Sequence, residues 1–404
     1  MPVDRRLAEH LAQQLTDQYR QLETALAGDV ARRLRAGAEQ PDWAAAKLAA
    51  MGVLSQYGQR LVARLNGTLA GTVEQLLVLA YVRGGKAALD DLFRLGRIDK
   101  PTFLERVARL LGLRRLFARR DRARIAAAAA DLIQVRRAFP GIDAVQRLAF
   151  GHVSLLQGVH LRILRWQLDV YRQVVAEAAP TVLLGTQTRL QLTQTVWDRL
   201  LAQGVTGFVD RRGRHWELAS YVEMATRTVI AQAAVQGHLD QLRAQGMDLV
   251  IVSDAPQECV LCRPWEGRVL SIDGPPGAHT VQAEHAIRDG VMVDVQVAGS
   301  VGEAIAAGLM HPNCRHSLSA FLPGVTKPPR HTEDPAGDKA RQQLRYLERR
   351  VRRWKFRAAV PIDPAEAARA QVKVRAYQAR IRSHLANEPG LKRQPHREQI
   401  GAAR

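Results

Sequence analysis

The three cysteines of this 404-residue chain lie in two short turns that are far apart in the sequence. Cys259 and Cys262 have the C-x2-C spacing that lets two thiolates of one tight turn point at a single metal ion. His311 and Cys314 are also three residues apart, with a turn-forming Pro-Asn pair between them. If these two turns face each other, they complete a Cys3His tetrahedron. The pattern therefore predicts a structural zinc site between two distant segments of the chain.

The fourth ligand has two candidates. We favour His311, because its turn mirrors the first one, and His316 is the alternative ligand. Cys314 and His316 are two residues apart and precede the strand-like segment SLSAFL, so both face the same side only if that strand begins early. The alternative without a metal is that the three cysteines are reduced thiols, which pack as small buried hydrophobic residues.

Length and cysteine content limit the class of protein. A chain of 404 residues has room for two or three domains, and three cysteines cannot form a disulfide framework. The N-terminal segment is charged and amphipathic, without the apolar core of a signal peptide. No run of about eighteen uncharged apolar residues occurs, so we expect no transmembrane helix and no membrane partner.

The charge balance points to a polyanionic partner. The chain has 59 Lys and Arg against 39 Asp and Glu, a formal net charge of +20, and a pI near 10.8. Most of the excess is arginine, which pairs bidentately with phosphate. The expected partner is nucleic acid or a strongly acidic protein surface. A GC-rich genome would explain arginine in place of lysine, but it would not explain the excess of cations over acids.

The N-terminal half, residues 1–203, reads as a helical arm or bundle. Apolar residues recur every three or four positions, as on one face of a helix, and no catalytic constellation is present. A Gly84-Gly85 pair is expected to kink the third helix. The predicted helices cover residues 4–36, 43–66, 68–95, a segment that opens at Pro101, 143–179 and 182–202.

Residues 204–325 change character and predict a small α+β domain that contains the two Cys/His turns. A short hairpin precedes a helix over 219–244, and β-branched runs then predict strands. These strands cover 248–255, 267–272 and 291–299, and residues 301–310 read as a short helix or turn. The expected fold class is therefore mainly α, with this small domain between two helical parts.

Beyond a Pro-rich linker, residues 326–340, the tail over 341–404 predicts a basic helical hairpin. Asp363-Pro364 is a typical helix start. The tail has 17 Lys and Arg against 5 Asp and Glu, which is +12 of the chain's +20. It predicts a phosphate-binding surface, and the alternative is a solvated basic face on a structural hairpin. The candidate nucleic-acid contacts are Arg349, Arg350, Arg352, Arg353, Lys355, Arg357, Lys392 and Arg393.

Several segments resemble a known family. They are YVEMATRT at 221–228, residues 237–254, CVLCRPWEGRVLSI at 259–272, HPNCRHSLSAFLPG at 311–324, and two basic stretches near the C-terminus. Together they resemble the phage minor capsid protein 2 family, which is similar to the minor head proteins of phage Mu and its relatives. The resemblance covers about residues 204–400. The motif positions are Cys259, Cys262, His311, Asn313, Cys314, Arg315 and His316.

The resemblance implies a virion structural protein rather than an enzyme. Such a protein is present in few copies, inside the capsid near the portal, and in the host cytoplasm during assembly. It implies roles in head morphogenesis, portal association and DNA packaging or retention. The implied partners are the portal or major capsid protein and double-stranded DNA, and a homo-oligomer remains open.

Two other functions stay as alternatives. The first is a metal-dependent nuclease, because His311, Asn313 and His316 have the letters of an HNH site, although those enzymes take the residues from separate elements. The second is a zinc-ribbon adaptor that binds nucleic acid. The zinc-deaminase order H-x-E…P-C-x-x-C and the phosphate loop G-x4-G-K-[ST] do not occur in the chain.

Overall fold

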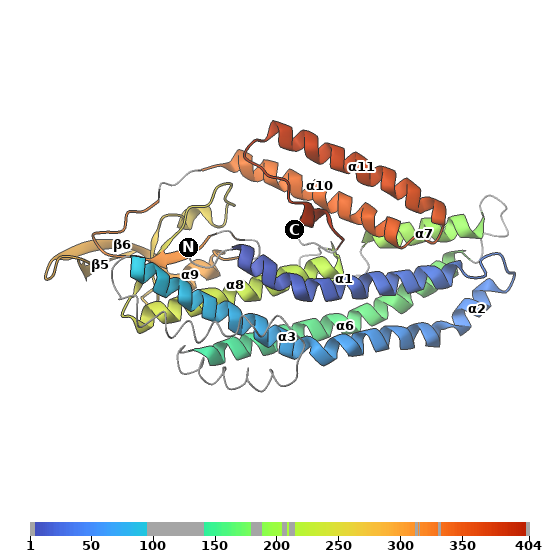
Figure 1. The fold of residues 1–404 in the computed structure, drawn as a ribbon, viewed down its shortest axis with the longest axis horizontal. Helices are drawn as coiled ribbons and strands as arrows, with labels where there is room; N and C mark the ends of the chain where they lie inside the picture. The colour runs from blue at the N-terminus through green and yellow to red at the C-terminus, as the bar shows by residue number, and fades with distance from the viewer. Residues whose placement is uncertain are drawn as a thin grey trace. The chain divides into compact units, whose positions relative to one another are not determined.

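The computed structural model describes residues 5–94, 141–178, 188–203, 208–209, 215–311, 314, 316–329 and 333–400 (Figure 1). The fold is mainly α, as predicted, with one small mixed sheet and a two-stranded hairpin of β1 (Phe208–Val209) and β2 (His215–Trp216), which the sequence also predicted. The helix expected from Pro101 lies outside the described residues. The described helices are α1 (Arg5–Arg35), α2 (Trp43–Ala49), α3 (Met51–Arg94), α6 (Ile142–Ala178), α7 (Arg189–Gln203), α8 (Leu218–Ala244), α9 (Val301–Ala306), α10 (Pro335–Ala359) and α11 (Pro364–Asn387).

The chain forms two compact units, each made of three separate stretches. The sheet unit consists of Met1–Leu11, Val73–Phe150 and Arg227–Asp338. The helical unit consists of Ala12–Thr72, Gly151–Thr226 and Lys339–Arg404. The boundaries fall inside long helices, so neither unit is one consecutive segment of the sequence.

The sheet unit contains five strands in the order β5-β6-β4-β3-β7, with β4 and β6 parallel and the other neighbours antiparallel. Its inner strand β3 is buried on both faces, because alternate residues enter two different cores. Val250 and Val252 pack with Leu242 of α8, and Leu249 and Ile251 pack on the opposite face. The strands are β3 (Leu249–Val252), β4 (Val269–Ser271), β5 (His279–Glu284), β6 (Met292–Ser300) and β7 (Leu318–Ala320).

Strand β5 was not predicted from the sequence. Its sequence HTVQAE is largely polar, and only Val281 and Ala283 pack against the core while the residues between them are exposed. It lies at the edge of the sheet and pairs with β6, with Val281 opposite Val295. An edge strand with one solvated face has a weak hydrophobic pattern, which explains why the sequence did not reveal it.

Helix α3 continues from Met51 to Arg94 through the Gly84-Gly85 pair, so the predicted boundary between helices 43–66 and 68–95 was wrong. A Cβ on Gly84 would lie 1.8 Å from the carbonyl oxygen of Ala234 in α8. A Cβ on Gly237 of α8 would lie 2.1 Å from the carbonyl oxygen of Tyr81. These glycines therefore allow the backbones of α3 and α8 to touch.

The core of the helical unit is built around large aromatic residues, among them the fully buried Trp43, Tyr171 and Trp197. A second apolar cluster joins α10 to α11, which run antiparallel side by side (Figure 1). This confirms the predicted C-terminal hairpin. The residues of that cluster are Leu344, Leu347, Val351, Val374 and Ile381.

The turn between α10 and α11 is anchored to α7. The indole Nε1 of Trp197 donates a hydrogen bond of 2.8 Å to the carbonyl of Val360. The Gln194 Oε1 accepts hydrogen bonds of 2.8 Å from the amides of Ile362 and Asp363. The Asp363 side chain caps α11 by accepting from Ala365 N at 3.0 Å, as the sequence predicts.

Helix α10 begins at Pro335, inside the segment expected to be linker. The Asp334 carboxylate accepts a hydrogen bond of 2.8 Å from the Gly337 amide, which makes Asp334 a capping residue ahead of a proline. Within the described part of the chain, no helix is long and apolar enough to cross a membrane.

Candidate metal centre and basic hairpin

The first Cys turn follows β3 in the sheet unit. The amides of Cys262 and Arg263 both donate to the Cys259 carbonyl at 3.1 Å, which closes a tight turn. The chain then continues into a short 3-10 helix, Arg263–Trp265. This turn is anchored by Glu258, whose buried carboxylate receives Arg263 Nε at 2.8 Å. The same carboxylate accepts from the Asp334 amide at 3.3 Å, which ties the turn to the start of α10.

The second turn repeats the geometry of the first. The Cys314 amide donates a hydrogen bond of 2.8 Å to the His311 carbonyl, across the same three-residue step. The turn lies between α9 and β7. Asn313 and Arg315, which belong to the family motif, lie outside the described residues.

The two turns meet. The Sγ atoms of Cys262 and Cys314 are 3.6 Å apart, and Cys259 Sγ lies 3.0 Å from His311 Nε2. The distance from Cys314 Sγ to His316 Nδ1 is 3.4 Å. Donor atoms within 4.8 Å of one another form two groups, Cys259–Cys262–His311 and Cys262–Cys314–His316, which share Cys262. The structure thus brings together all five side chains proposed from the sequence.

Two of the separations, and the donor types, fit zinc. A tetrahedral ion with Zn–S bonds of about 2.3 Å places two sulfurs about 3.8 Å apart, and a sulfur and an imidazole nitrogen about 3.5 Å apart. The Cys262–Cys314 and Cys314–His316 distances are close to these values. All three cysteines are free thiols. Thiolates combined with imidazole are the donor set that zinc prefers.

Glu266 completes the arrangement behind His316, and sequence reasoning missed it. Its side chain is fully buried and hydrogen-bonds to His316 Nε2, while His316 Nδ1 faces Cys314. A carboxylate on the far nitrogen of a ligating histidine fixes the ring orientation in many zinc sites. The available sequence signal was an acid four residues after Cys262.

The pKa values of the cluster's side chains depend on one another. The hydrogen bond to Cys314, followed by burial, raises the pKa of Cys262, while the hydrogen bond from Cys262 and then the contacts with His316 lower the pKa of Cys314. Burial opposes the charged form of His316, but its hydrogen bonds to Cys314 and Glu266 outweigh burial and raise its pKa. The side chains can thus hold negative charge on sulfur.

A cavity of about 330 Å³ borders the second turn. His311, Cys314 and His316 line one side of it, and α8 residues such as Val235 and Leu239 line another. The cluster is therefore reachable from a cavity rather than sealed inside the core, which provides an entry path for an ion.

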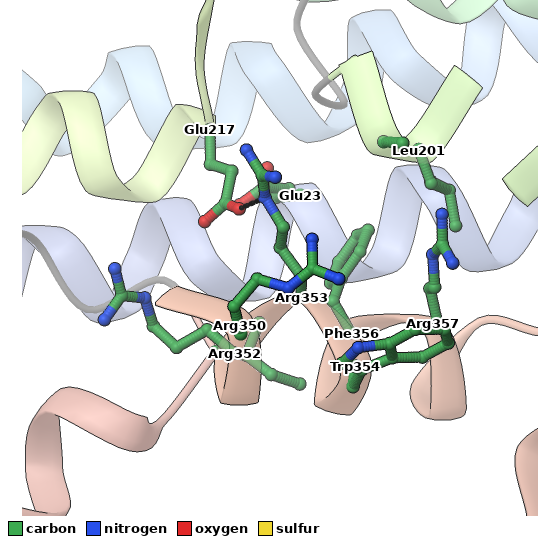
Figure 2. Close-up of a pocket in the computed structure, with 11 residues that line it drawn as sticks. Glu23, Leu201, Glu217, Arg350, Arg352, Arg353, Trp354, Phe356 and Arg357 are labelled. Atoms are coloured by element: carbon green, nitrogen blue, oxygen red, sulfur yellow. Dashed lines mark hydrogen bonds and ion pairs between the residues drawn. The ribbon is translucent and has the colours of Figure 1, made fainter. Parts of the chain in front are cut away.

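Several of the basic residues that were proposed to bind nucleic acid instead contact other parts of the helical unit (Figure 2). Arg352 is 2% exposed, and its Nη1 donates to the Arg397 carbonyl at 2.6 Å. Arg353 points at the Glu217 carboxylate, with Nε 3.3 Å from the oxygen. Arg357 donates to the Asp198 carbonyl at 2.7 Å.

The remaining proposed residues divide into engaged and open side chains. Arg350 lies over the Tyr377 ring, 5.1 Å from its centroid, and Lys355 is 3.5 Å from Gln399 Oε1. Arg393 pairs with Glu398 at 2.7 Å, and Arg349 is half-buried. Lys392 is exposed, without a hydrogen bond or ion pair to any described residue. The basic run of α10 therefore serves largely to attach the hairpin to its own unit.

Sequence comparison relates most of the chain to known proteins. A family profile described as "Phage minor capsid protein 2" matches residues 3–110 and 122–386. The chain is 28% identical over 249 residues to a structural protein of Lactococcus phage LL-H, covering 59% of this chain and 63% of that protein. It is 35% identical over 106 residues to a structural protein of Lactococcus phage mv4, covering 24% of this chain and 86% of that protein. No solved structure matches.

Proposed function

The chain belongs to the phage minor capsid protein 2 family, and from that premise we propose that it is a head protein that holds a structural zinc and binds double-stranded DNA. In this proposal the sheet unit carries the zinc and the hairpin of the helical unit faces the DNA. The protein takes part in head morphogenesis and in DNA packaging or retention, and it associates with the portal or the major capsid protein. The match with the LL-H protein spans 63% of that relative's length, so these roles stand as proposals.

The proposed zinc ligands are Cys259, Cys262, Cys314 and His316. The sequence favoured His311 as the fourth ligand. The burial of His316 and its contact with the Glu266 carboxylate support His316 instead. A side chain that is already fixed in position loses less conformational freedom when it binds the ion. When bound, the metal cross-links the turn after β3 to the turn before β7. The chain's own part is to hold Cys262, Cys314 and His316 close together, while Cys259 Sγ belongs to the neighbouring donor group and would have to move towards them to complete the tetrahedron.

The observation that carries the DNA role is the concentration of charge. Residues 341–404 have a net charge of +12 out of the chain's +20. A surface of this kind binds the phosphates of DNA without sequence preference. Its affinity for DNA falls steeply as the salt concentration rises. Inside a phage head the protein would meet DNA at very high concentration, so even weak contacts would be occupied. Association with portal or coat is supported by family membership alone.

Two measurements test the function. Binding of the full-length protein to a fluorescent 30-base-pair duplex is followed by anisotropy over a series of KCl concentrations. We expect log K to fall linearly with log salt, with no preference between duplex sequences. In parallel, the gene is deleted from the phage that encodes it, and the particles are analysed for this protein and for DNA content. DNA-filled, infectious heads that form normally without the protein would refute the proposed role.

A further inference from the structure

Helix α11 carries several open cations of the C-terminal hairpin. Over Pro364–Asn387 it has five Lys and Arg and a single acid, Glu366. Among these cations Lys373, Arg375 and Arg382 are exposed and form no hydrogen bond or ion pair with any residue that the structure describes. None of the five was proposed from the sequence as a nucleic-acid contact.

Helices α10 and α11 are both basic, but several cations of α10 have partners within the helical unit. Cations of α10 reach Glu217, Asp198 and the Arg397 carbonyl within the helical unit. Two of these contacts are ion pairs, with the Glu217 and Asp198 carboxylates, and paired charges contribute little to attracting a further anion. Arg352 is instead held inside the unit by burial and by a neutral carbonyl. Among the described residues, the cations of α11 form one ion pair, between Arg369 and Glu366. The exposed, unpaired cations of the two hairpin helices therefore lie mainly on α11.

The α11 cations form two rows. Arg369, Lys373 and Arg380 are spaced by four and seven residues, and Arg375 and Arg382 by seven, so each set returns to one side of the helix. The buried face, marked by Ala370, Val374 and Ile381, packs on α10. The two rows border the outward face on either side of a ridge of small or apolar residues, and this ridge comprises Val372, Ala376, Ala379 and Ser383.

We propose that the outward face of α11, rather than the basic run of α10, is the surface that binds double-stranded DNA, with its two rows of cations contacting phosphates. This inference rests on the proposed function and assigns it to particular residues. The helix has 24 residues and is about 36 Å long, close to one turn of B-DNA. With side chains it is about 10–12 Å wide, and the major groove is about 12 Å wide. Each row can therefore address one of the two backbones that border the groove.

The ridge between the rows implies binding without sequence preference. Base edges are read mainly by Arg, Lys, Asn and Gln side chains directed into a groove. The exposed ridge positions Val372, Ala376 and Ala379 offer no such donors or acceptors. Phosphate contacts position a protein on the duplex but do not select a site. The ligand class is thus the DNA backbone, and its arrangement on α11 favours a duplex over a single strand.

The test compares two full-length triple variants that lose the same charge. The α11 variant is Lys373→Gln/Arg375→Gln/Arg382→Gln. The matched control is Arg35→Gln/Arg60→Gln/Arg64→Gln, which removes exposed, unpaired cations elsewhere on the helical unit. We expect the α11 variant to bind the 30-base-pair duplex at least about tenfold more weakly at 0.1 M KCl. Its plot of log K against log salt should be shallower by about 2 to 3, since each lost phosphate contact removes about 0.9.

The outcomes separate this inference from the function on which it rests. If the wild-type protein does not bind DNA, the proposed DNA role fails and the inference fails with it. If the wild-type binds but the α11 variant keeps its slope, or the control loses as much affinity, DNA binding stands and the assignment to α11 is overturned. Poly-glutamate that competes as well as duplex DNA would assign α11 to an acidic protein instead. Should the triple variant melt at a lower temperature, the three single substitutions replace it, and each should lower the slope by about 0.9.

Discussion

The Sγ atoms of Cys262 and Cys314 lie 3.6 Å apart, although 52 positions separate the two residues in the sequence. Strands β4, β5 and β6 and helix α9 lie between them along the chain. A metal that joins the two sulfurs closes that entire segment into a loop, and closing a long loop removes more conformational freedom from the unfolded chain than closing a short one. The cluster is therefore placed where a cross-link has a large effect on the stability of the sheet unit.

Loss of one shared thiolate should remove the metal and destabilise the fold. We expect the purified protein to contain about one zinc per chain and the Cys262→Ser variant to contain none, because Cys262 belongs to both donor groups. We also expect the melting temperature to fall by about 5 °C or more, both in the variant and in the wild type treated with chelator. Elemental analysis and calorimetry measure the two effects. Val260→Ser is the control, since Val260 is in the same turn but 73% exposed.

The two histidines can be separated by the same approach. His316→Ala should abolish zinc binding, whereas His311→Ala should retain it. Glu266→Gln should weaken zinc affinity by about 10- to 100-fold, because the amide holds the imidazole less firmly than the carboxylate does. Competition with a chromogenic chelator gives the affinities. Loss of zinc in His311→Ala with retention in His316→Ala would return the fourth position to the residue that the sequence favoured.

Sequence patterns identified those parts of the fold that depend on local periodicity and on turn chemistry. The apolar run of β3, the Asp363 cap and the C-terminal helical hairpin were all predicted correctly. Strand β5 was missed because an edge strand needs apolar residues on one face only. The two compact units were not recognisable either, since each combines stretches that are far apart in the chain. Helix periodicity shows which face of a helix is buried, but not which other segment covers it.

Sequence patterns had the same limit at the two candidate sites, since they do not show which distant residues lie beside each other. Metal-ligand spacing brought out the two Cys/His turns, because the chemistry requires it within each turn. Glu266 acts through its position behind His316, which no spacing rule specifies. For the basic tail, composition gave the sign and size of the charge, but Arg352 and Lys373 look alike in sequence. Only the fold distinguishes a guanidinium that is buried against Arg397 from an ammonium that stays open on α11.

Gly84 should tolerate no side chain, in contrast to other glycines of the same helix. Gly84→Ala places a methyl group 1.8 Å from the Ala234 carbonyl oxygen, so α3 and α8 must move apart. We expect a loss of about 2–3 kcal/mol in the free energy of unfolding. Gly71→Ala in the same helix meets no atom within 4 Å and should instead stabilise by about 0.5–1 kcal/mol. Urea unfolding of both variants gives the comparison, and equal stability of the two would contradict the close contact.

Acid should destabilise the helical unit through His160. Its Nε2 accepts from the Tyr19 hydroxyl at 2.6 Å, and its Nδ1 is 2.8 Å from Asn66 Oδ1, an arrangement that suits a neutral imidazole. Burial lowers the pKa of His160 to about 4, from about 6.5 in the unfolded chain. Between these values the unfolded state binds a proton that the folded state excludes, so stability falls as the pH drops from about 6.5 towards 4. The contribution is about 3–4 kcal/mol at most. Urea unfolding at pH 7, 6 and 5 should show a weaker pH dependence for His160→Gln than for wild type or for the exposed control His396→Gln. An unchanged dependence would show that the pKa of His160 is the same in the folded and unfolded protein, which contradicts the prediction.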